Sequence, residues 1–316
     1  MATPTLLDKE SLNSALKYIW GQYRTWDLTS AALKSKMWRW RYIVLVLSIA
    51  GAILGTLSQQ VGGWQIAAIP AWIPGTLGVL SGLSLGAASY LTKEVLNSGP
   101  ESDAVRTRAA AEALKREAYL LATGAPPYAT ATNADQLLEK AQEIRGGVNG
   151  IAPLALTSAQ EQQGVPAAGM SVDEYVQQRV VQQIDDYYLT QVRLNTQKVA
   201  LGRKVSLALG ALAILLGFWS AKSASVAGWV AVIGAITAAI AAYQYAGRYQ
   251  FLNVSYQATA DRLNWLKTRW EIDGRRQPGD DAKHAFILAA EDAIATENSA
   301  WMAEWTKKQD SNSNRS

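Results

Sequence analysis

The stretch IPGTLGVLSGLSLGAASYLT, residues 73–92, decides the fold class because it is apolar and carries no charge. An α-helix of about 20 apolar residues spans the hydrocarbon core of a bilayer. The stretch belongs to a charge-free run between Arg41 and Lys93, and a second run from Lys204 to Arg248 is interrupted only by Lys222. Each run has room for two spans. We therefore predict an all-α, polytopic membrane protein whose four transmembrane helices form two hairpins, at residues 42–58, 73–92, 205–221 and 225–247.

Part of this stretch, GLSLG at residues 82–86, also fits the G-x-S-x-G nucleophile elbow of serine hydrolases. The only histidine, His284, follows it in the hydrolase chain order. An elbow, however, needs a strand before the serine and a helix after it, and the sequence lacks the alternating β-branched runs that indicate strands. We therefore expect Ser84 to be chemically inert and the protein not to be an enzyme.

Small residues recur every three or four positions along the expected spans. At about 100° per residue such positions share one helical face, and small residues let helices pack closely in lipid. The sequence does not indicate whether these faces meet the same chain or another copy. The predicted helix-packing residues are Gly51, Gly55, Gly75, Gly78, Gly82, Gly86, Gly210, Gly217 and Gly234. A pore would instead use weakly polar side chains, for which the candidates are Ser81, Ser84, Thr237 and Gln244.

Composition excludes several kinds of site. The chain has no cysteine, which removes disulfides and thiolate metal ligands, and its single histidine leaves little for histidine-based metal chemistry. We expect no cofactor and no metal site. The expected spans carry no acidic or basic residue except Lys222 near an edge, which argues against proton relays, voltage sensors and coupled transporters. A pore lined by hydroxyl groups and backbone remains open.

Basic residues cluster on one side of the expected spans, and the short loops between paired spans carry only Lys222. Because short cytoplasmic segments are enriched in Lys and Arg, this distribution predicts that both termini and the middle segment are cytoplasmic. The clusters lie where membrane topology requires them, so we expect no nucleic-acid partner. The flanking residues are Lys34, Lys36, Arg39 and Arg41 before the first span, Lys93 after the second, Lys198, Arg203 and Lys204 before the third, and Arg248 after the fourth.

Two halves of the chain share one layout, a polar helical segment followed by a basic cluster, two spans and a further polar helix. Residues 22–55, QYRTWDLTSAALKSKMWRWRYIVLVLSIAGAILG, correspond in order to residues 185–217, DDYYLTQVRLNTQKVALGRKVSLALGALAILLG. This order predicts a parallel duplication of a two-span unit. We assign residues 1–130 to the first unit with its cytoplasmic helices, 131–170 to a cytoplasmic linker region, 171–308 to the second unit and 309–316 to a disordered tail.

Two cytoplasmic segments, LKREAYLLATGAPPY at 114–128 and YVQQRVVQQIDDYY at 175–188, resemble the SLATT family. These are two-span domains found beside SMODS nucleotidyltransferases and SLOG nucleotide sensors in bacteria. The resemblance covers most of the chain and implies two tandem units that act as membrane effectors in conflict systems. It supplies no established functional residues. The matching positions include Lys115, Arg116, Glu117, Tyr128, Tyr175, Arg179, Gln183 and Tyr187, and at the closing helix Glu291, Glu297 and Trp301.

Two functions from different classes follow. The leading hypothesis is an oligomeric channel or pore-type effector in the bacterial plasma membrane, responding to a cytoplasmic nucleotide signal or protein partner. The alternative is a non-conducting membrane scaffold that recruits cytoplasmic partners. The lipid bilayer and further copies of the chain are the expected partners in the first case. The face that repeats every fourth residue, from Tyr175 to Tyr187, indicates a clamp between helices more than a ligand pocket.

Overall fold

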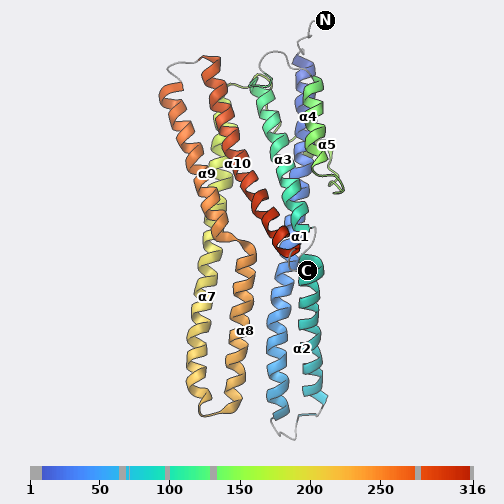
Figure 1. The fold of residues 1–316 in the computed structure, drawn as a ribbon, viewed down its shortest axis with the longest axis vertical. Helices are drawn as coiled ribbons and strands as arrows, with labels where there is room; N and C mark the ends of the chain where they lie inside the picture. Colours follow the sequence, from blue (N-terminus) through green and yellow to red (C-terminus); the bar gives the residue numbers. More distant parts are fainter. Residues whose placement is uncertain are drawn as a thin grey trace. The chain divides into compact units, whose positions relative to one another are not determined.

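The computed structural model describes residues 9–63, 69–70, 72–96, 100–128, 134–274 and 279–313. Within these ranges the chain forms helices and no strand, which confirms the all-α prediction (Figure 1). The α-helices are α1 (Lys9–Gly63), α2 (Trp72–Leu91), α3 (Pro100–Thr123), α4 (Ala134–Gly146), α5 (Ser158–Glu161), α6 (Val172–Tyr175), α7 (Thr190–Ser220), α8 (Ala224–Gly247), α9 (Tyr249–Arg269) and α10 (Asp280–Ser313). The π-helical turns are η1 (Thr92–Leu96), η2 (Val176–Val181), η3 (Gln183–Leu189) and η4 (Trp270–Gly274).

Each of the four predicted spans lies within a helix. By length and composition, three helical segments of the described chain can cross a membrane: Glu10–Gly63, Val172–Ser220 and Val226–Asp273. The remaining predicted span, residues 73–92, coincides with α2, a 20-residue helix. The glycines and serines of α2 lower its mean hydropathy below that of the three longer segments. Its length nevertheless matches the thickness of a bilayer core.

The described chain divides into two compact units, each assembled from separate segments. Unit 1 comprises Met1–Lys34, Glu101–Val192 and Val254–Ser316, and unit 2 comprises Ser35–Pro100 and Arg193–Asn253. Unit 2 therefore contains the apolar helices, whereas unit 1 contains the polar ones. Both halves of the predicted duplication contribute to both units, so the duplicated sequence units are not the spatial ones.

In unit 2, α1 and α2 form a hairpin held by serine hydroxyl groups. Ser81 Oγ donates to the Gly51 carbonyl at 2.7 Å, and Ser58 Oγ donates to the Pro74 carbonyl at 2.7 Å. A second hairpin pairs α7 with α8 through a tight turn closed by the Lys222 amide on the Trp219 carbonyl. Hydroxyl–carbonyl bonds and close backbone approach are the contacts that hold helices together in lipid, where apolar burial between them gains little.

The helix of the fourth span does not continue without a break. Arg248 adopts a left-handed conformation, with φ 47° and ψ 30°, and separates α8 from α9. The sequence predicts that the helix of the fourth span continues into the polar segment YQFLNVSYQATADRLNWLKTRWEID at residues 249–273. A non-glycine residue in this region is uncommon and costs conformational energy, so tertiary contacts determine the break.

In unit 1, the first part of α1 lies beside α3 (Figure 1), and the Trp20 and Tyr119 rings of these helices meet edge to face. Ser30 Oγ on α1 donates to the Ala104 carbonyl on α3 at 3.2 Å. The segment assigned to the cytoplasmic linker contains the helix α4. The tail predicted to be disordered begins at residue 309, whereas α10 continues to Ser313.

Candidate functional site

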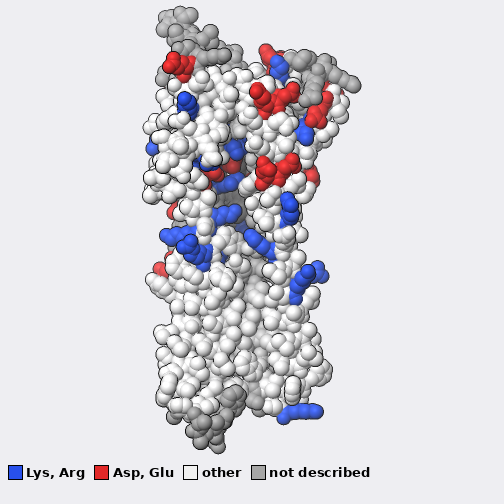
Figure 2. Space-filling model, turned by 180° about the vertical axis from the view of Figure 1, so that it is seen from behind, with Lys and Arg blue, Asp and Glu red and all other residues white. Residues whose placement is uncertain are grey.

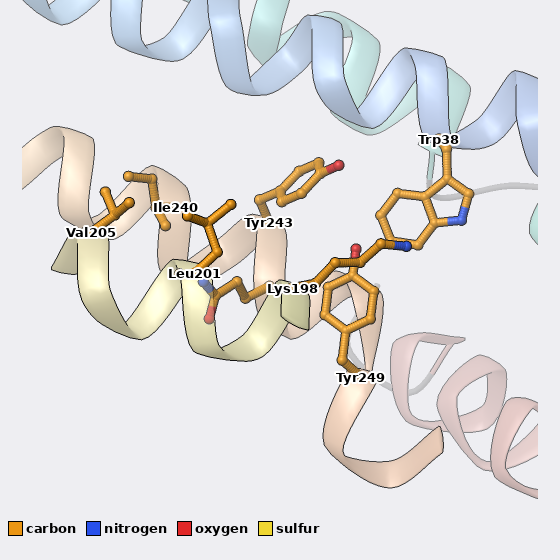
Figure 3. Close-up of a pocket in the computed structure, with 9 residues that line it drawn as sticks. Trp38, Lys198, Leu201, Val205, Ile240, Tyr243 and Tyr249 are labelled. Carbon is orange, nitrogen blue, oxygen red and sulfur yellow. The ribbon is translucent and has the colours of Figure 1, made fainter. Parts of the chain in front are cut away.

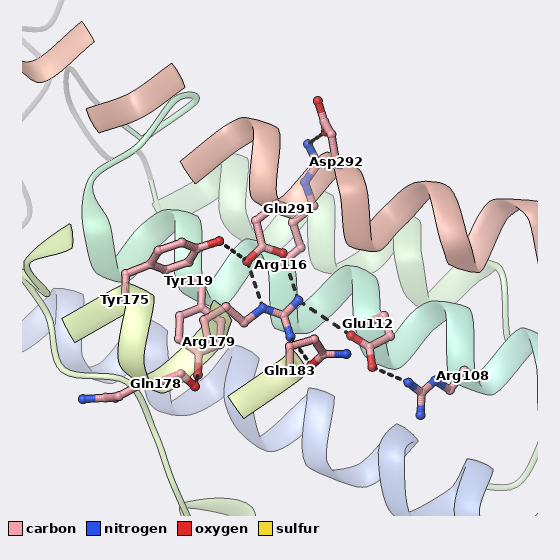
Figure 4. Close-up of polar contacts among 10 residues, drawn as sticks. All are labelled: Arg108, Glu112, Arg116, Tyr119, Tyr175, Gln178, Arg179, Gln183, Glu291 and Asp292. Carbon is pink, nitrogen blue, oxygen red and sulfur yellow. Dashed lines mark hydrogen bonds and ion pairs between the residues drawn. The ribbon is translucent and has the colours of Figure 1, made fainter. Parts of the chain in front are cut away.

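A single buried arginine lies at the centre of unit 1. The Arg179 side chain is 1% exposed and faces the Glu291 carboxylate of α10 (Figure 4). Its Nε donates to Oε1 and its Nη2 donates to Oε2, each at 2.9 Å. Such bidentate pairs are among the strongest protein hydrogen bonds. Burying either charge alone would cost several kcal/mol, so the pairing geometry decides whether unit 1 tolerates them.

Neutral side chains complete the coordination of this pair. Tyr175 Oη donates to Glu291 Oε1 at 3.0 Å, and Gln183 Oε1 accepts from Arg179 Nη1 at 3.4 Å. The guanidinium carbon lies 5.2 Å from the centre of the Tyr119 ring, in the geometry of a cation–π contact. Each charged atom of the pair is thus surrounded by polar or π partners.

A second carboxylate approaches the same guanidinium from α3. Glu112 Oε1 accepts from Arg108 Nη2 at 2.9 Å, whereas its Oε2 lies 3.7 Å from Arg179 Nη2, an ion pair too long for a hydrogen bond. We call Glu112, Tyr175, Arg179, Gln183 and Glu291 the Arg179 cluster. It joins α3, the η2–η3 segment and α10.

The charges in the cluster stabilise one another. Burial opposes the ionisation of Glu112, but Arg108, Lys115 and Arg179 outweigh it and lower its pKa to about 2. Burial likewise disfavours the charged form of Arg179, yet the carboxylate of Glu291 outweighs burial and raises its pKa. Glu112 and Arg179 are therefore both charged near neutral pH.

The π turns explain why residues four apart reach one cluster. In a regular α-helix, a spacing of four residues rotates each successive side chain by about 40°. Tyr175, Arg179 and Gln183 lie at the end of α6 and in η2 and η3, where i→i+5 turns hold more residues per turn. The wider turns reduce this rotation between successive side chains. Tyr175 and Gln183 therefore both contact the ion pair that Arg179 forms.

Other residues of the predicted motif form the surroundings of the cluster. Lys115 Nζ lies 5.3 Å from the centre of the Tyr23 ring on α1. Burial, and then repulsion from Arg179, lower the pKa of Lys115 to about 8. The hydroxyl oxygens of Tyr187 and Tyr256 lie 3.4 Å apart.

Three further motif residues lie away from the centre. Arg116 Nη2 donates to Asp292 Oδ1 at 2.7 Å in an exposed pair. Tyr128 Oη donates to Glu117 Oε2 at 2.6 Å, which fixes the chain after the end of α3. The side chain of Trp301 lies outside the described residues.

Glu297 differs from the other acids because its charge is poorly compensated. Its side chain is buried, and burial raises its pKa to about 7, with Arg108 opposing and Glu112 reinforcing the shift. The carboxyl group therefore changes charge near neutral pH inside unit 1.

Comparison with protein families shows which families two parts of the chain resemble. Residues 175–301 match the family described as SMODS and SLOG-associating 2TM effector domain 1, SLATT_1. Residues 175–301 are therefore similar to a SLATT domain. Residues 24–136 match a family described as a protein of unknown function, DUF4231, which is a related SLATT-like region. No curated protein and no solved structure matches the chain.

The Arg179 cluster joins the SLATT domain to the SLATT-like region before it. Arg179 and Glu291 lie within 175–301, whereas Glu112 lies within 24–136. Arg108 adds a second link, because its guanidinium carbon lies 4.7 Å from the centre of the Tyr187 ring. In the structure these residues bond one another, as a clamp between helices would require. Among the described residues, no group of His, Cys, Asp and Glu could hold a metal ion.

The predicted packing glycines divide into two groups. A Cβ atom at Gly51 would lie 2.6 Å from Leu85, one at Gly55 would lie 2.9 Å from Ser81, and one at Gly78 would lie 3.2 Å from Ser58. These three glycines line the α1–α2 contact. A Cβ placed at the other predicted positions would have no contact within 4 Å beyond its own stretch of helix, and these positions are Gly75, Gly82, Gly86, Gly210, Gly217 and Gly234.

The structure places the four candidate pore-lining residues in different surroundings. Ser81 is buried and its hydroxyl is bonded to Gly51, so it belongs to the hairpin contact and not to a water path. Gln244 lies against Gly202, where α7 and α8 approach most closely. Ser84 is half-buried on α2, and Thr237 Oγ1 donates to the Ile233 carbonyl of its own helix at 2.8 Å.

Sequence reasoning missed several residues of these sites. Glu112 and Arg108 lie in the helical pattern RTRAAAEALKRE, where spacing of three and four indicates the same face as Lys115 but not its burial. Gly202 lies beside Arg203 and Lys204, outside the expected span, so the sequence did not indicate it. It is nevertheless the glycine of closest approach in the second hairpin.

Proposed function

We propose that the protein is an oligomeric membrane channel or pore-type effector of the bacterial plasma membrane, with both termini in the cytoplasm. The observation that carries this proposal is the set of glycines on α2, α7 and α8 whose faces contact no other part of the described chain. Helices in lipid associate by close packing at such faces. Faces left open by the single chain support contacts with further copies, and a closed ring of copies can surround a path through the membrane.

The chemistry of unit 2 supports weak ionic selectivity. Its apolar helices carry no charged side chain between Arg41 and Lys93, and only Lys222 between Lys204 and Arg248. The face drawn in Figure 2 shows the same depletion over these helices. A path lined by Ser84, Thr237 and backbone would lack the fixed charge rings that discriminate cations from anions.

The family supports an effector role, because the matched domain is described as a two-transmembrane effector. We propose that a cytoplasmic nucleotide signal or a protein partner acts on unit 1. The Arg179 cluster fixes three helical segments there, so a change at their surface can be transmitted as a movement of whole helices.

The proposal is tested on the protein reconstituted in proteoliposomes. Native mass spectrometry would count the copies, and an ion-flux assay on the same preparation would measure conduction. We expect a closed oligomer, with Gly82→Ile reducing both copy number and flux. Ser84→Ala, two residues away on the same helix, is the matched control and should leave the copy number unchanged.

A monomer or a simple dimer that shows no flux would contradict the proposal. That outcome would leave the non-conducting scaffold. Loss of flux with an unchanged copy number in Gly82→Ile would mean that this face does not mediate assembly.

A further inference from the structure

A pocket of about 500 Å³ opens in unit 2 between α1, α7, α8 and the first residue of α9 (Figure 3). Its volume lies within the range of sites that bind small molecules. Figure 3 shows the Lys198 side chain directed toward Trp38 and Tyr249, with Val205 and Ile240 at the other end. None of the family assignments places a ligand here.

The lining changes from polar to apolar along the helix axis. Lys198 and Val205 are both on α7, and a separation of seven residues corresponds to about 10 Å. The end with Lys198 borders the charged residues that flank the spans, and the end with Val205 and Ile240 enters the charge-free run. This gradient matches a phospholipid, whose anionic headgroup lies a few ångströms outside its acyl chains.

The aromatic rings at the polar end are already in contact with a cation. Lys198 Nζ lies 5.7 Å from the centre of the Trp38 ring and 5.3 Å from that of Tyr249, and the two rings are stacked at 5.6 Å. A choline-type ligand would need those ring faces and would be repelled by the ammonium. A phosphate group would instead gain a charge-assisted hydrogen bond from Lys198.

Nothing acidic in the described part of unit 2 neutralises this end. Among the described residues no carboxylate lies within ion-pair distance of Lys198, whose contacts are the two rings. Glu94 is the only acidic residue in the sequence of unit 2. Its basic residues are Lys36, Arg39, Arg41, Lys93, Arg193, Lys198, Arg203, Lys204, Lys222 and Arg248.

Gly202 sets the shape of the pocket wall. A Cβ atom at this position would overlap the side-chain amide of Gln244, so the missing side chain lets that amide lie directly against α7. The amide supplies hydrogen-bond donors beside the pocket.

We propose that this pocket binds an anionic phospholipid, with its phosphate on Lys198 and the upper part of an acyl chain along Leu201, Val205 and Ile240. Basic pockets between transmembrane helices bind anionic headgroups in this way. The inference goes beyond channel activity and does not depend on it, since a scaffold could hold the same lipid.

Native mass spectrometry of the full chain tests the site. The detergent-solubilised protein is titrated with phosphatidylglycerol or with phosphatidylcholine of the same acyl chains. We expect phosphatidylglycerol to bind more tightly, and Lys198→Gln to weaken it about tenfold. Lys204→Gln is the matched control, because it removes an exposed charge on the same helix that does not line the pocket, and it should leave binding unchanged.

A second variant probes the apolar end without changing charge. Leu201 is 64% exposed at the pocket, so Leu201→Trp should fold normally and fill the acyl groove. Binding of phosphatidylglycerol should then fall although Lys198 is intact. Size-exclusion profiles that match the wild type would show that assembly is preserved.

Three results would overturn the proposal. Equal binding of the two lipids would exclude headgroup selection, and equal weakening by Lys198→Gln and Lys204→Gln would indicate surface charge alone. Displacement of phosphatidylglycerol by millimolar inorganic phosphate would assign the pocket to a soluble phosphate and not to a lipid.

Discussion

Unit 1 and unit 2 are built from one chain but are held together by different interactions. In unit 1, the buried positions include Arg179, Glu112 and Glu291, which are fixed by ion pairs and hydrogen bonds. In unit 2, the contacts that hold the helices are a glycine meeting a neighbouring side chain and a serine hydroxyl meeting a carbonyl. The difference follows from the solvent around each unit.

A unit surrounded by water can bury apolar surface and add a few satisfied charges at its centre. A unit surrounded by lipid gains little from burying apolar side chains, so shape complementarity at small residues provides the specificity. Substitutions should therefore act by charge in unit 1 and by volume in unit 2.

The largest effect is expected from breaking the central ion pair. Glu291→Gln removes the charge that faces Arg179 and leaves the guanidinium buried with only Glu112 at 3.7 Å. Removing one partner of a buried pair costs about 3–5 kcal/mol. Thermal unfolding followed by circular dichroism should show a clearly lower transition, and hydrogen exchange should increase in α10. An unchanged transition would mean that the cluster does not stabilise unit 1.

A volume change in unit 2 should have the next largest effect. A Cβ atom at Gly51 would lie 2.6 Å from Leu85, so Gly51→Ile should separate α1 from α2 at a cost of about 1–3 kcal/mol. Gly82→Ile adds the same side chain on an open face and is the comparison. Unfolding of the monomer in detergent should distinguish them, with Gly51→Ile alone lowering the transition. Equal transitions would contradict the assignment of the two faces.

A smaller and pH-dependent effect is expected at Glu297. Its pKa of about 7 in the folded chain exceeds the ordinary value of 4.5, so the folded state holds an extra proton between these values. Stability from this group therefore falls as pH rises from 4.5 to 7. Glu297→Gln removes the dependence, and its melting temperature relative to the wild type should be higher at pH 8 than at pH 5. A pH-independent difference would show that this carboxyl group is not buried as described.

The smallest effect is expected from the exposed ion pair beside the cluster. Asp292 follows Glu291 on α10, but its side chain is 65% exposed, against 0% for Glu291. Exposed pairs contribute roughly 0–1 kcal/mol. Asp292→Asn should therefore shift the unfolding transition only slightly, and a shift as large as that of Glu291→Gln would contradict the explanation based on burial.

The sequence predicted the elements better than their contacts. Charge-free runs located all four apolar helices, because a bilayer imposes a length and a composition. The SLATT resemblance singled out Tyr175 and Arg179 in one segment and Glu291 in the closing helix, without bringing them together. Their bidentate geometry could not be predicted, since it depends on π turns that no residue pattern marks. The left-handed conformation of Arg248 could not be predicted either, because tertiary contacts and not the local sequence determine it.

The most direct test of the proposed function is planar-bilayer recording on the reconstituted oligomer, with cytoplasmic nucleotides, Ca²⁺ and voltage as stimuli. The account predicts discrete current steps with weak preference between cations and anions, which Gly82→Ile abolishes because it prevents assembly. Persistent silence from a correctly assembled wild-type oligomer under all three stimuli, together with a structure of the assembly that shows no axial path, would contradict the pore and leave a membrane scaffold.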